Sequence, residues 1–292
     1  MRKRRIWELT RPYVMIGPAM IGIGLFVLYP LIYLIYLSFF KYNLLNKSMS
    51  KFVGFDNYVQ IFSRGDFYKA LTNTAIYTGG VVIITMALSL LFAVWLSKRT
   101  RINAIVQAGL FTPHIVSIVS VSLIWLWLME PNLGFLNYIL KTLGLPTSQW
   151  LQSSSTALLS IIIVSVWQAI GYYALILVAA LQGVSPTIYE AAALDNAGRF
   201  KVFRKITLPL ISPQLFFILV IMTIGSFKVF DTVRIMTAGG PNNATNTLVY
   251  YIYTFRTTNI GFAAATGVIL MIIIGILTII YFRLMAKKVH YQ

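Results

Sequence analysis

Long apolar runs recur along this chain and define its predicted architecture. A helix needs about 20 mostly apolar residues to cross the hydrocarbon core of a bilayer, so runs of this length are typical of transmembrane helices. The pattern predicts six spans, at residues 13–40, 71–96, 104–129, 156–181, 213–230 and 261–282. The runs lack the polar and apolar alternation of transmembrane barrel strands. We therefore expect an all-α, polytopic membrane protein with six transmembrane helices.

Prolines and short patterned segments refine this layout near the N-terminus. Pro18 and Pro30 lie inside the first span and predict a kinked helix. In the loop that follows, Asn57, Ile61 and their neighbours Tyr58 and Phe62 have helical spacing, which predicts a short amphipathic helix at the membrane interface.

Two later segments have the composition of outer surfaces. Residues 130–155 combine aromatic side chains with turn residues, which suits contact with lipid headgroups. Residues 231–260 contain a sharp turn at Gly239-Gly240-Pro241. The apolar and aromatic stretch after this turn is too short to span and is expected at the interface.

The basic residues indicate the orientation of the spans. Fifteen of the 24 Lys and Arg residues fall in four short segments on one side, at 2–11, 98–101, 199–205 and 283–288. Basic residues close to membrane ends favour the cytoplasmic side, so both termini are predicted to be cytoplasmic. The net charge of +17 then reflects topology and attraction to anionic lipid rather than nucleic-acid binding.

Composition excludes several other classes of protein. Only 11% of the residues are charged, against about 25% in soluble domains. The chain has no cysteine, so neither a disulfide framework nor a cysteine metal site is expected. The basic N-terminus resembles a signal peptide, but the first apolar run is too long for one and should be retained as an anchor.

A polar, basic segment at residues 185–213 interrupts this apolar chain. Ser185 can cap a helix that begins at Pro186. Ile188 and the alanines at 191–193 would give that helix a low-profile apolar surface that another protein can approach closely. Asp195 and Asn196 tolerate the left-handed conformation and should end the helix. A second, basic helix is expected at 199–206, which Leu208-Pro209 and Pro213 would stop before the next span begins.

This segment resembles the EAA loop in the membrane subunits of binding-protein-dependent ABC importers. The residues that match the family's spacing are Glu190, Ala191, Ala192, Asp195, Ala197, Phe203, Ile206, Leu208, Pro209 and Pro213. Gly198 follows the turn, and Asn196 stands where the family most often has glycine. The stretches VGFDNYVQIF, TAGGPNNATNTLVYYIY and KKVHYQ also resemble the carbohydrate and glycerol-phosphate branch of these permeases.

The resemblance implies a type I ABC importer permease fold and a set of partners. Residues 1–69 would hold the N-terminal tail, first helix and first outer loop, residues 70–284 the permease domain, and residues 285–292 a cytoplasmic tail. The partners would be a second homologous permease, a cytosolic ATPase dimer and an extracytoplasmic solute-binding protein in a bacterial or archaeal plasma membrane. This chain lacks a GxxxxGK[ST] loop, so ATP and Mg²⁺ would be used by the ATPases, with no cofactor or metal here.

A substrate path is predicted in the later spans. Gln168, Tyr172 and Tyr173 are costly in a membrane unless they face a partner or a cavity. Amide and aromatic groups together suit sugars, whose ring faces stack while their hydroxyls form hydrogen bonds. The family resemblance also places Tyr173 and Ser226 at sugar-contacting positions. Lys228 is a weaker candidate, because it could simply pair with Asp231 three residues later.

Rival functions fit the sequence less well. Within the family, a permease for amino acids, phosphate or another polar solute is possible. A glycerol-phosphate permease is possible too, and Lys228 would then matter as a cation. A secondary transporter would need coupling acids inside the spans, yet the seven acidic residues lie in loops or at span ends, with Asp231 and Glu130 as borderline cases. A membrane-embedded enzyme would need clustered His, Asp or Glu at membrane depth, and His114 stands without a nearby acid.

Overall fold

The computed structural model describes the backbone of residues 2–42 and 50–285, and the side chains of residues 11–42 and 50–283. The predicted tail at 285–292, with Lys287, Lys288 and His290, lies almost wholly outside the described residues. The chain divides into two compact units, residues 1–64 with 252–271 and residues 65–251 with 272–292. Each unit is described by itself, and the predicted domain boundaries stay predictions.

The first unit contains the N-terminal helix and a small hairpin. Its elements are α1 (Arg2–Ile23), a π-helical turn (Gly24–Leu28), α2 (Tyr29–Ser38), β1 (Phe40–Lys41), β2 (Lys51–Phe52), α3 (Asp56–Phe62) and the start of α15 (Ile260–Met285). The two strands are antiparallel, with Phe40 opposite Phe52. The π turn ends two residues before Pro30, whose missing N–H disturbs the regular helix. The predicted irregularity of the first span therefore takes the form of a π turn.

Helix α3 holds this unit together through one buried amide. The side chain of Asn57 donates to the carbonyls of Ser38 at 2.8 Å and Phe40 at 3.0 Å, and Ile61 on the same helix is fully buried. A Cβ on Gly261 would lie only 1.6 Å from the Phe40 carbonyl oxygen, so only glycine lets α15 approach here. The predicted short helix is confirmed, with one face buried against the chain.

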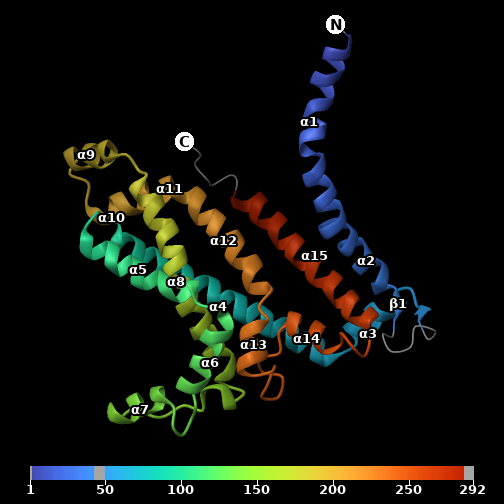
Figure 1. Ribbon diagram of the computed structural model, residues 1–292. Coiled ribbons are helices and arrows are strands. Elements are labelled where there is room, and N and C mark those ends of the chain that lie inside the picture. Colours follow the sequence, from blue (N-terminus) through green and yellow to red (C-terminus); the bar gives the residue numbers. More distant parts are fainter. Residues whose placement is uncertain (1, 43–49, 286–292) are drawn as a thin grey trace. The chain divides into compact units, whose positions relative to one another are not determined.

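The second unit is built on a long helix pair, α4 (Gly65–Leu96) and α8 (Ala157–Gln182). Against this pair pack α5 (Arg101–Ile115), α6 (Ile118–Leu128), α12 (Ser212–Phe227) and α13 (Asp231–Met236). Gly171 of α8 meets the backbone of α5, because a Cβ there would lie 1.7 Å from the Leu110 carbonyl oxygen. In Figure 1, α7 (Phe135–Thr142) and α9 (Pro186–Leu194) lie at opposite ends of this unit, and α8 runs between them.

Five helical segments are long and apolar enough to span a membrane: Arg11–Ser38, Gly65–Leu96, Ala157–Gln182, Ser212–Met236 and Ile260–Arg283. They correspond to five of the six predicted spans. The span predicted at residues 104–129 takes the form of a bent pair, because α5 and α6 meet at an angle of 96°. Pro113 lacks the N–H for a helical bond, and Val116 is extended with ψ 140°. Six spans result if this bent pair is one span.

The segment after α13 is tied to α4 by a side-chain amide. Asn73 of α4 donates to the carbonyls of Asn243 and Asn246 at 2.8 and 2.9 Å, which holds the turn that follows α13. Positive φ angles at Ala238 and Gly239 confirm the sharp turn predicted there. The stretch after it forms α14 (Leu248–Thr254), which is too short to span, as predicted.

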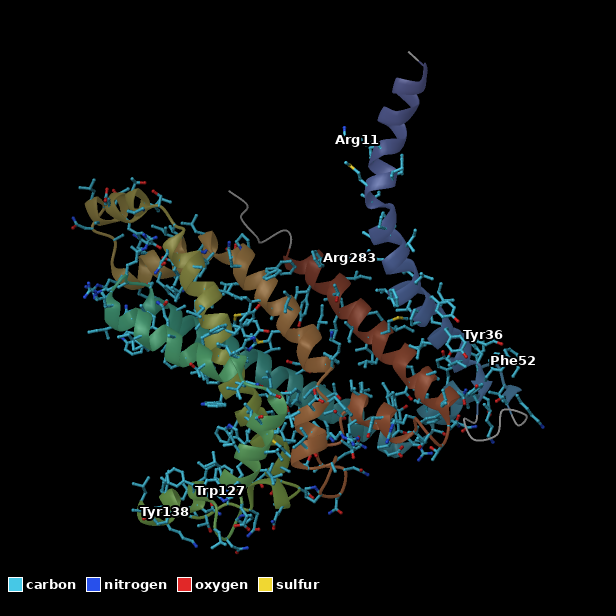
Figure 2. The ribbon with its side chains drawn as sticks, viewed as in Figure 1. Arg11, Tyr36, Phe52, Trp127, Tyr138 and Arg283 are labelled. Atoms are coloured by element: carbon cyan, nitrogen blue, oxygen red, sulfur yellow. The ribbon has the colours of Figure 1, made fainter. Side chains whose placement is uncertain are left out.

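The lobe around α7 is organised by a second amide. Asn137 donates to the carbonyls of Pro131 and Ser148, and its oxygen accepts the indole N–H of Trp150 at 2.8 Å. Trp127 and Tyr138 lie exposed on α6 and α7 of this lobe (Figure 2). Exposed aromatic side chains at a span end fit the predicted contact with the membrane interface.

Candidate functional site

The loop between α8 and α12 begins with helix α9. Pro186 occupies the first turn of α9, as predicted, but the Ser185 hydroxyl makes no capping bond and instead lies 2.8 Å from the Thr187 hydroxyl. Helix α9 ends at Leu194 with Asp195 as its C-cap, and Asn196 has φ 49°. The predicted left-handed turn is therefore present, with asparagine tolerating a positive φ.

The end of α9 is a Schellman motif. The N–H of Ala197 donates to the Ala192 carbonyl and that of Asn196 to the Ala193 carbonyl, both at 3.0 Å. This pairing satisfies carbonyls that would otherwise lack partners and fixes the direction of the chain after the helix. Gly198 then adopts extended angles before α10 (Arg199–Val202) begins.

The second half of the loop differs from the prediction. Leu208 and Pro209 do not stop the basic helix, because α10 continues through a π turn (Phe203–Thr207) into α11 (Leu208–Leu210). The break comes at Ile211, which has φ −93° and ψ 5°. Pro213 then lies in the first turn of α12, where proline is tolerated because that N–H has no helical partner. Pro213 therefore marks the start of the span, as predicted, while Pro209 lies inside a helix.

The alanines of α9 do not share one surface. Ala192 is only 5% exposed and packs inside this chain, whereas Ala191, Ala193 and Glu190 are exposed. The prediction of a joint apolar surface at 191–193 is therefore wrong for Ala192. The sequence did not single out Leu194, which is 86% exposed at the end of the same helix. Phe200 of α10 is also exposed.

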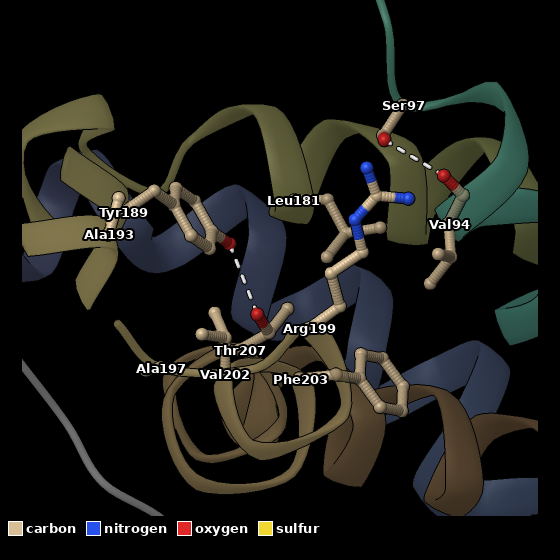
Figure 3. A pocket seen from close by; sticks show the side chains of 10 residues that line it. All are labelled: Val94, Ser97, Leu181, Tyr189, Ala193, Ala197, Arg199, Val202, Phe203 and Thr207. Carbon is tan, nitrogen blue, oxygen red and sulfur yellow. Dashed lines mark hydrogen bonds between the residues drawn. The ribbon is translucent and has the colours of Figure 1, made fainter. Parts of the chain in front are cut away.

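A cavity of about 460 Å³ lies beneath this loop. Figure 3 shows Tyr189 and Arg199 from the loop facing Leu181 of α8 and Val94 of α4 across it. The Tyr189 hydroxyl lies 3.3 Å from that of Thr207 and links α9 to the π turn.

A second cavity, of about 360 Å³, brings together most of the predicted substrate path. Gln168, Tyr173, Ser226 and Lys228 all line it. Tyr172 does not line it. Its ring stacks on the imidazole of His114, with centroids 4.3 Å apart.

Residues that the sequence did not single out for this role complete the cavity wall. Tyr77 and Ser165 line it and are joined by a hydrogen bond of 2.8 Å between α4 and α8. His114 and Thr232 line it as well. The wall therefore combines uncharged hydroxyl, amide and ring groups with aliphatic side chains and with the charged residues Lys228 and Asp231. Among the residues that the structure describes, no group of three His, Cys, Asp or Glu could hold a metal ion.

Lys228 and Asp231 both line this cavity. In the described part of the chain neither side chain forms an ion pair, so the pairing considered from their i,i+3 spacing is absent. Lys228 is exposed at the cavity wall, where its charge is available to a solute.

Glu130 is an acidic residue outside the spans with a clear structural role. Its carboxylate accepts hydrogen bonds from the backbone N–H groups of Leu133 and Asn132. These donors, Leu133 foremost, favour the charged form and lower the pKa of Glu130. The carboxylate thereby orders the turn that leads from α6 into the α7 lobe.

Comparison with known proteins decides the family. Residues 85–291 match the family of binding-protein-dependent transport system inner membrane components. The chain belongs to this family. It is a multi-pass membrane component of a binding-protein-dependent transport system, which confirms the importer resemblance of residues 190–213.

Named relatives match along nearly the whole chain. The probable ABC transporter permease protein YurN of Bacillus subtilis (strain 168) is 33% identical over 269 residues, covering 90% of this chain and 91% of YurN. The sn-glycerol-3-phosphate transport system permease protein UgpA of Yersinia pestis bv. Antiqua (strain Antiqua) is 34% identical over 284 residues, covering 96% of each. The predicted carbohydrate and glycerol-phosphate branch of ABC permeases is confirmed by these relatives.

A solved structure has the same fold. The crystal structure of a bacterial alginate ABC transporter, in complex with an alginate pentasaccharide-bound periplasmic protein, contains a chain that matches with a TM-score of 0.84. The match covers 98% of this chain and 100% of that chain at 23% identity. At this identity the similarity concerns the fold, and it confirms the predicted all-α permease fold.

Proposed function

We propose that this permease forms, with a second homologous permease, the membrane path of an ATP-driven carbohydrate importer. A cytosolic dimer of ABC ATPases uses ATP and Mg²⁺, while this chain hydrolyses nothing. An extracytoplasmic binding protein delivers the sugar. Both termini and α9 face the cytoplasm of a bacterial or archaeal cell, in line with the basic segments at 98–101 and 199–205.

The exposed side of α9 is the observation that carries this proposal. Glu190, Ala191 and Leu194 are exposed on a capped helix beyond the membrane end of α8. A leucine that is 86% exposed on a structured helix suits burial in a groove of a partner protein. We infer that ATP-driven closure of the ATPases moves α9 of this chain and the equivalent helix of the partner permease together. This movement opens the substrate cavity outward.

The cavity chemistry supports a carbohydrate substrate. Tyr173 offers a ring face, and Gln168 and Ser226 offer uncharged hydrogen-bonding groups. The alginate transporter and the UgpA proteins are named for an acidic polysaccharide and for glycerol 3-phosphate. An anionic solute is therefore the second candidate. The unpaired ammonium of Lys228 in the cavity wall would favour it, and the Asp231 carboxylate in the same wall would oppose it.

Lys228→Gln separates these two substrates. Uptake of glycerol 3-phosphate should fall strongly in this variant if the solute is anionic, because Lys228 is then its counter-charge. Uptake of a neutral sugar should change little, since neutral hydroxyls do not need a cation. Equal loss for both probes would assign Lys228 to structure.

Docking of the ATPase on α9 can be tested by substituting two leucines of equal exposure. Leu194 and Leu133 are each 86% exposed, but they lie on α9 and in the α7 lobe, at opposite ends of the second unit. We expect Leu194→Asp to lower co-purification of the ATPase about tenfold or more, because a charge would enter an apolar groove. Leu133→Asp should retain the ATPase. Equal retention by both variants would refute the docking role of α9.

A further inference from the structure

A basic cavity of about 370 Å³ lies at the turn between α4 and α5. Its cationic side chains are Lys98, Arg99 and Arg101, and Gln107 and Gln182 complete its wall. None of the three cations forms an ion pair within the described part of the chain. Three positive charges that face one hollow repel one another, so an anion in that hollow would be stabilised.

The carbonyls at the end of α4 accept no hydrogen bonds from these cationic side chains. Basic side chains often satisfy the last carbonyls of a helix. Here neutral amides do so: Gln107 donates to Leu96 at 3.0 Å, Gln182 to Ser97 at 3.0 Å and Asn103 to Lys98 at 2.8 Å. Three consecutive carbonyls are therefore capped from α5 and α8. The turn is held in place, and its positive charges remain available to a ligand.

Exposed apolar side chains lie on α4 and α5, on either side of the turn that holds the cavity. Leu91 and Trp95 are exposed one turn apart near the end of α4, and Ile102 and Ile105 are exposed one turn apart on α5. Such faces suit acyl chains, and tryptophan is favoured at the level of the headgroups. A soluble anion would use the cations alone, whereas a phospholipid would use the cations and both apolar faces.

We propose that this cavity binds the headgroup phosphate of an anionic phospholipid. The phosphate lies among Lys98, Arg99 and Arg101, and the acyl chains follow the exposed faces of α4 and α5. Because Gln182 ends α8 and only three residues separate it from α9, the bound lipid also steadies the base of the loop at 185–213.

Native mass spectrometry of the purified transport complex tests this site. Phosphatidylglycerol and phosphatidylcholine are titrated into the detergent-solubilised complex, and their retention is compared. We expect the triple variant Lys98→Gln, Arg99→Gln, Arg101→Gln to lose the preference for phosphatidylglycerol by about tenfold. The matched control replaces Lys201, Arg204 and Lys205 by glutamine, which removes the same charge outside the cavity, and it should keep the preference.

Several outcomes would overturn the proposal. An unchanged preference in the first triple variant, or an equal loss in both, would mean that no specific site exists. Displacement of phosphatidylglycerol by excess inorganic phosphate would assign the cavity to a free anion. Loss of the ATPase with unchanged lipid retention would make the surface a protein contact. If the triple variant cannot be recovered intact, the single variant Arg99→Gln takes its place and should lower the preference for phosphatidylglycerol about threefold. An unchanged preference in Arg99→Gln would refute the site as well.

Discussion

Gly171→Ala should destabilise this protein although it adds only one methyl group. The new Cβ would lie 1.7 Å from the carbonyl oxygen of Leu110 and 2.3 Å from its carbon. Both are backbone atoms, so no side-chain rotation relieves the overlap. At least 1.3 Å of withdrawal by α5 is needed to bring the closest distance to 3.0 Å. Overpacking of this kind typically destabilises a fold by about 1–3 kcal/mol.

The movement of α5 would also reach the 360 Å³ cavity that we propose as the substrate site. His114 lies one turn beyond Leu110, and its ring contact with Tyr172 at 4.3 Å depends on close approach of α5 to α8. We therefore expect Gly171→Ala to lower solute uptake as well as the melting temperature.

Gly109→Ala is the matched control on the neighbouring helix. A Cβ at Gly109 meets no atom within 4 Å, and alanine favours a helix over glycine by roughly 0.5–1 kcal/mol. The assay is the loss of the intact complex on heating, followed by size-exclusion chromatography. Gly109→Ala should melt at or above the wild-type temperature and Gly171→Ala clearly below it. Equal melting of the two variants would refute the helix contact at Gly171.

Three further predictions concern the cavity, the outer turn and the topology. Tyr173→Ala should weaken sugar uptake by roughly 1–2 kcal/mol through loss of a stacking surface, and Tyr172→Ala, outside the cavity wall, should weaken it less; the reverse order in liposome uptake would remove Tyr173 from the path. The pKa of Glu130 is lowered in the folded protein, so its charged form stabilises the fold above the ordinary pKa of 4.5, and this stability is lost as the pH falls through the lowered value. Glu130→Gln should therefore flatten the decline of the melting temperature below pH 4.5. Parallel melting curves for the variant and the wild type would contradict this. Reporter fusions at Arg101 should read inside and at Leu145 outside, and an inside signal at Leu145 would refute the predicted orientation.

The spans were predictable from sequence because lipid imposes a simple rule. Each span must be a long apolar helix, so hydropathy alone located all six apolar regions. Hydropathy did not predict the bend between α5 and α6, because Pro113 is compatible with a continuous helix when neighbours satisfy the freed carbonyl. Here Val116 turns extended instead, and only packing against α8 and α13 decides between these outcomes.

The sequence predicted which residues belong to the candidate site better than it predicted which way their side chains face. Asn196 was expected to carry the left-handed turn, since its side chain tolerates positive φ, and it does. The inward direction of Ala192 depends on how α9 packs, which adjacent identical alanines cannot reveal. The contribution of Tyr77 to the cavity requires the register between α4 and α8, which is set by contacts distant in sequence.

The most direct test of the central claim is transport by the purified complex in liposomes. Labelled neutral sugars and labelled glycerol 3-phosphate are supplied with the binding protein outside, and ATP is enclosed on the side of α9. The account predicts uptake that requires both ATP and the binding protein and that is lost in Leu194→Asp. Uptake that persists without ATP and follows an ion gradient would contradict it, because the chain would then act as a secondary transporter.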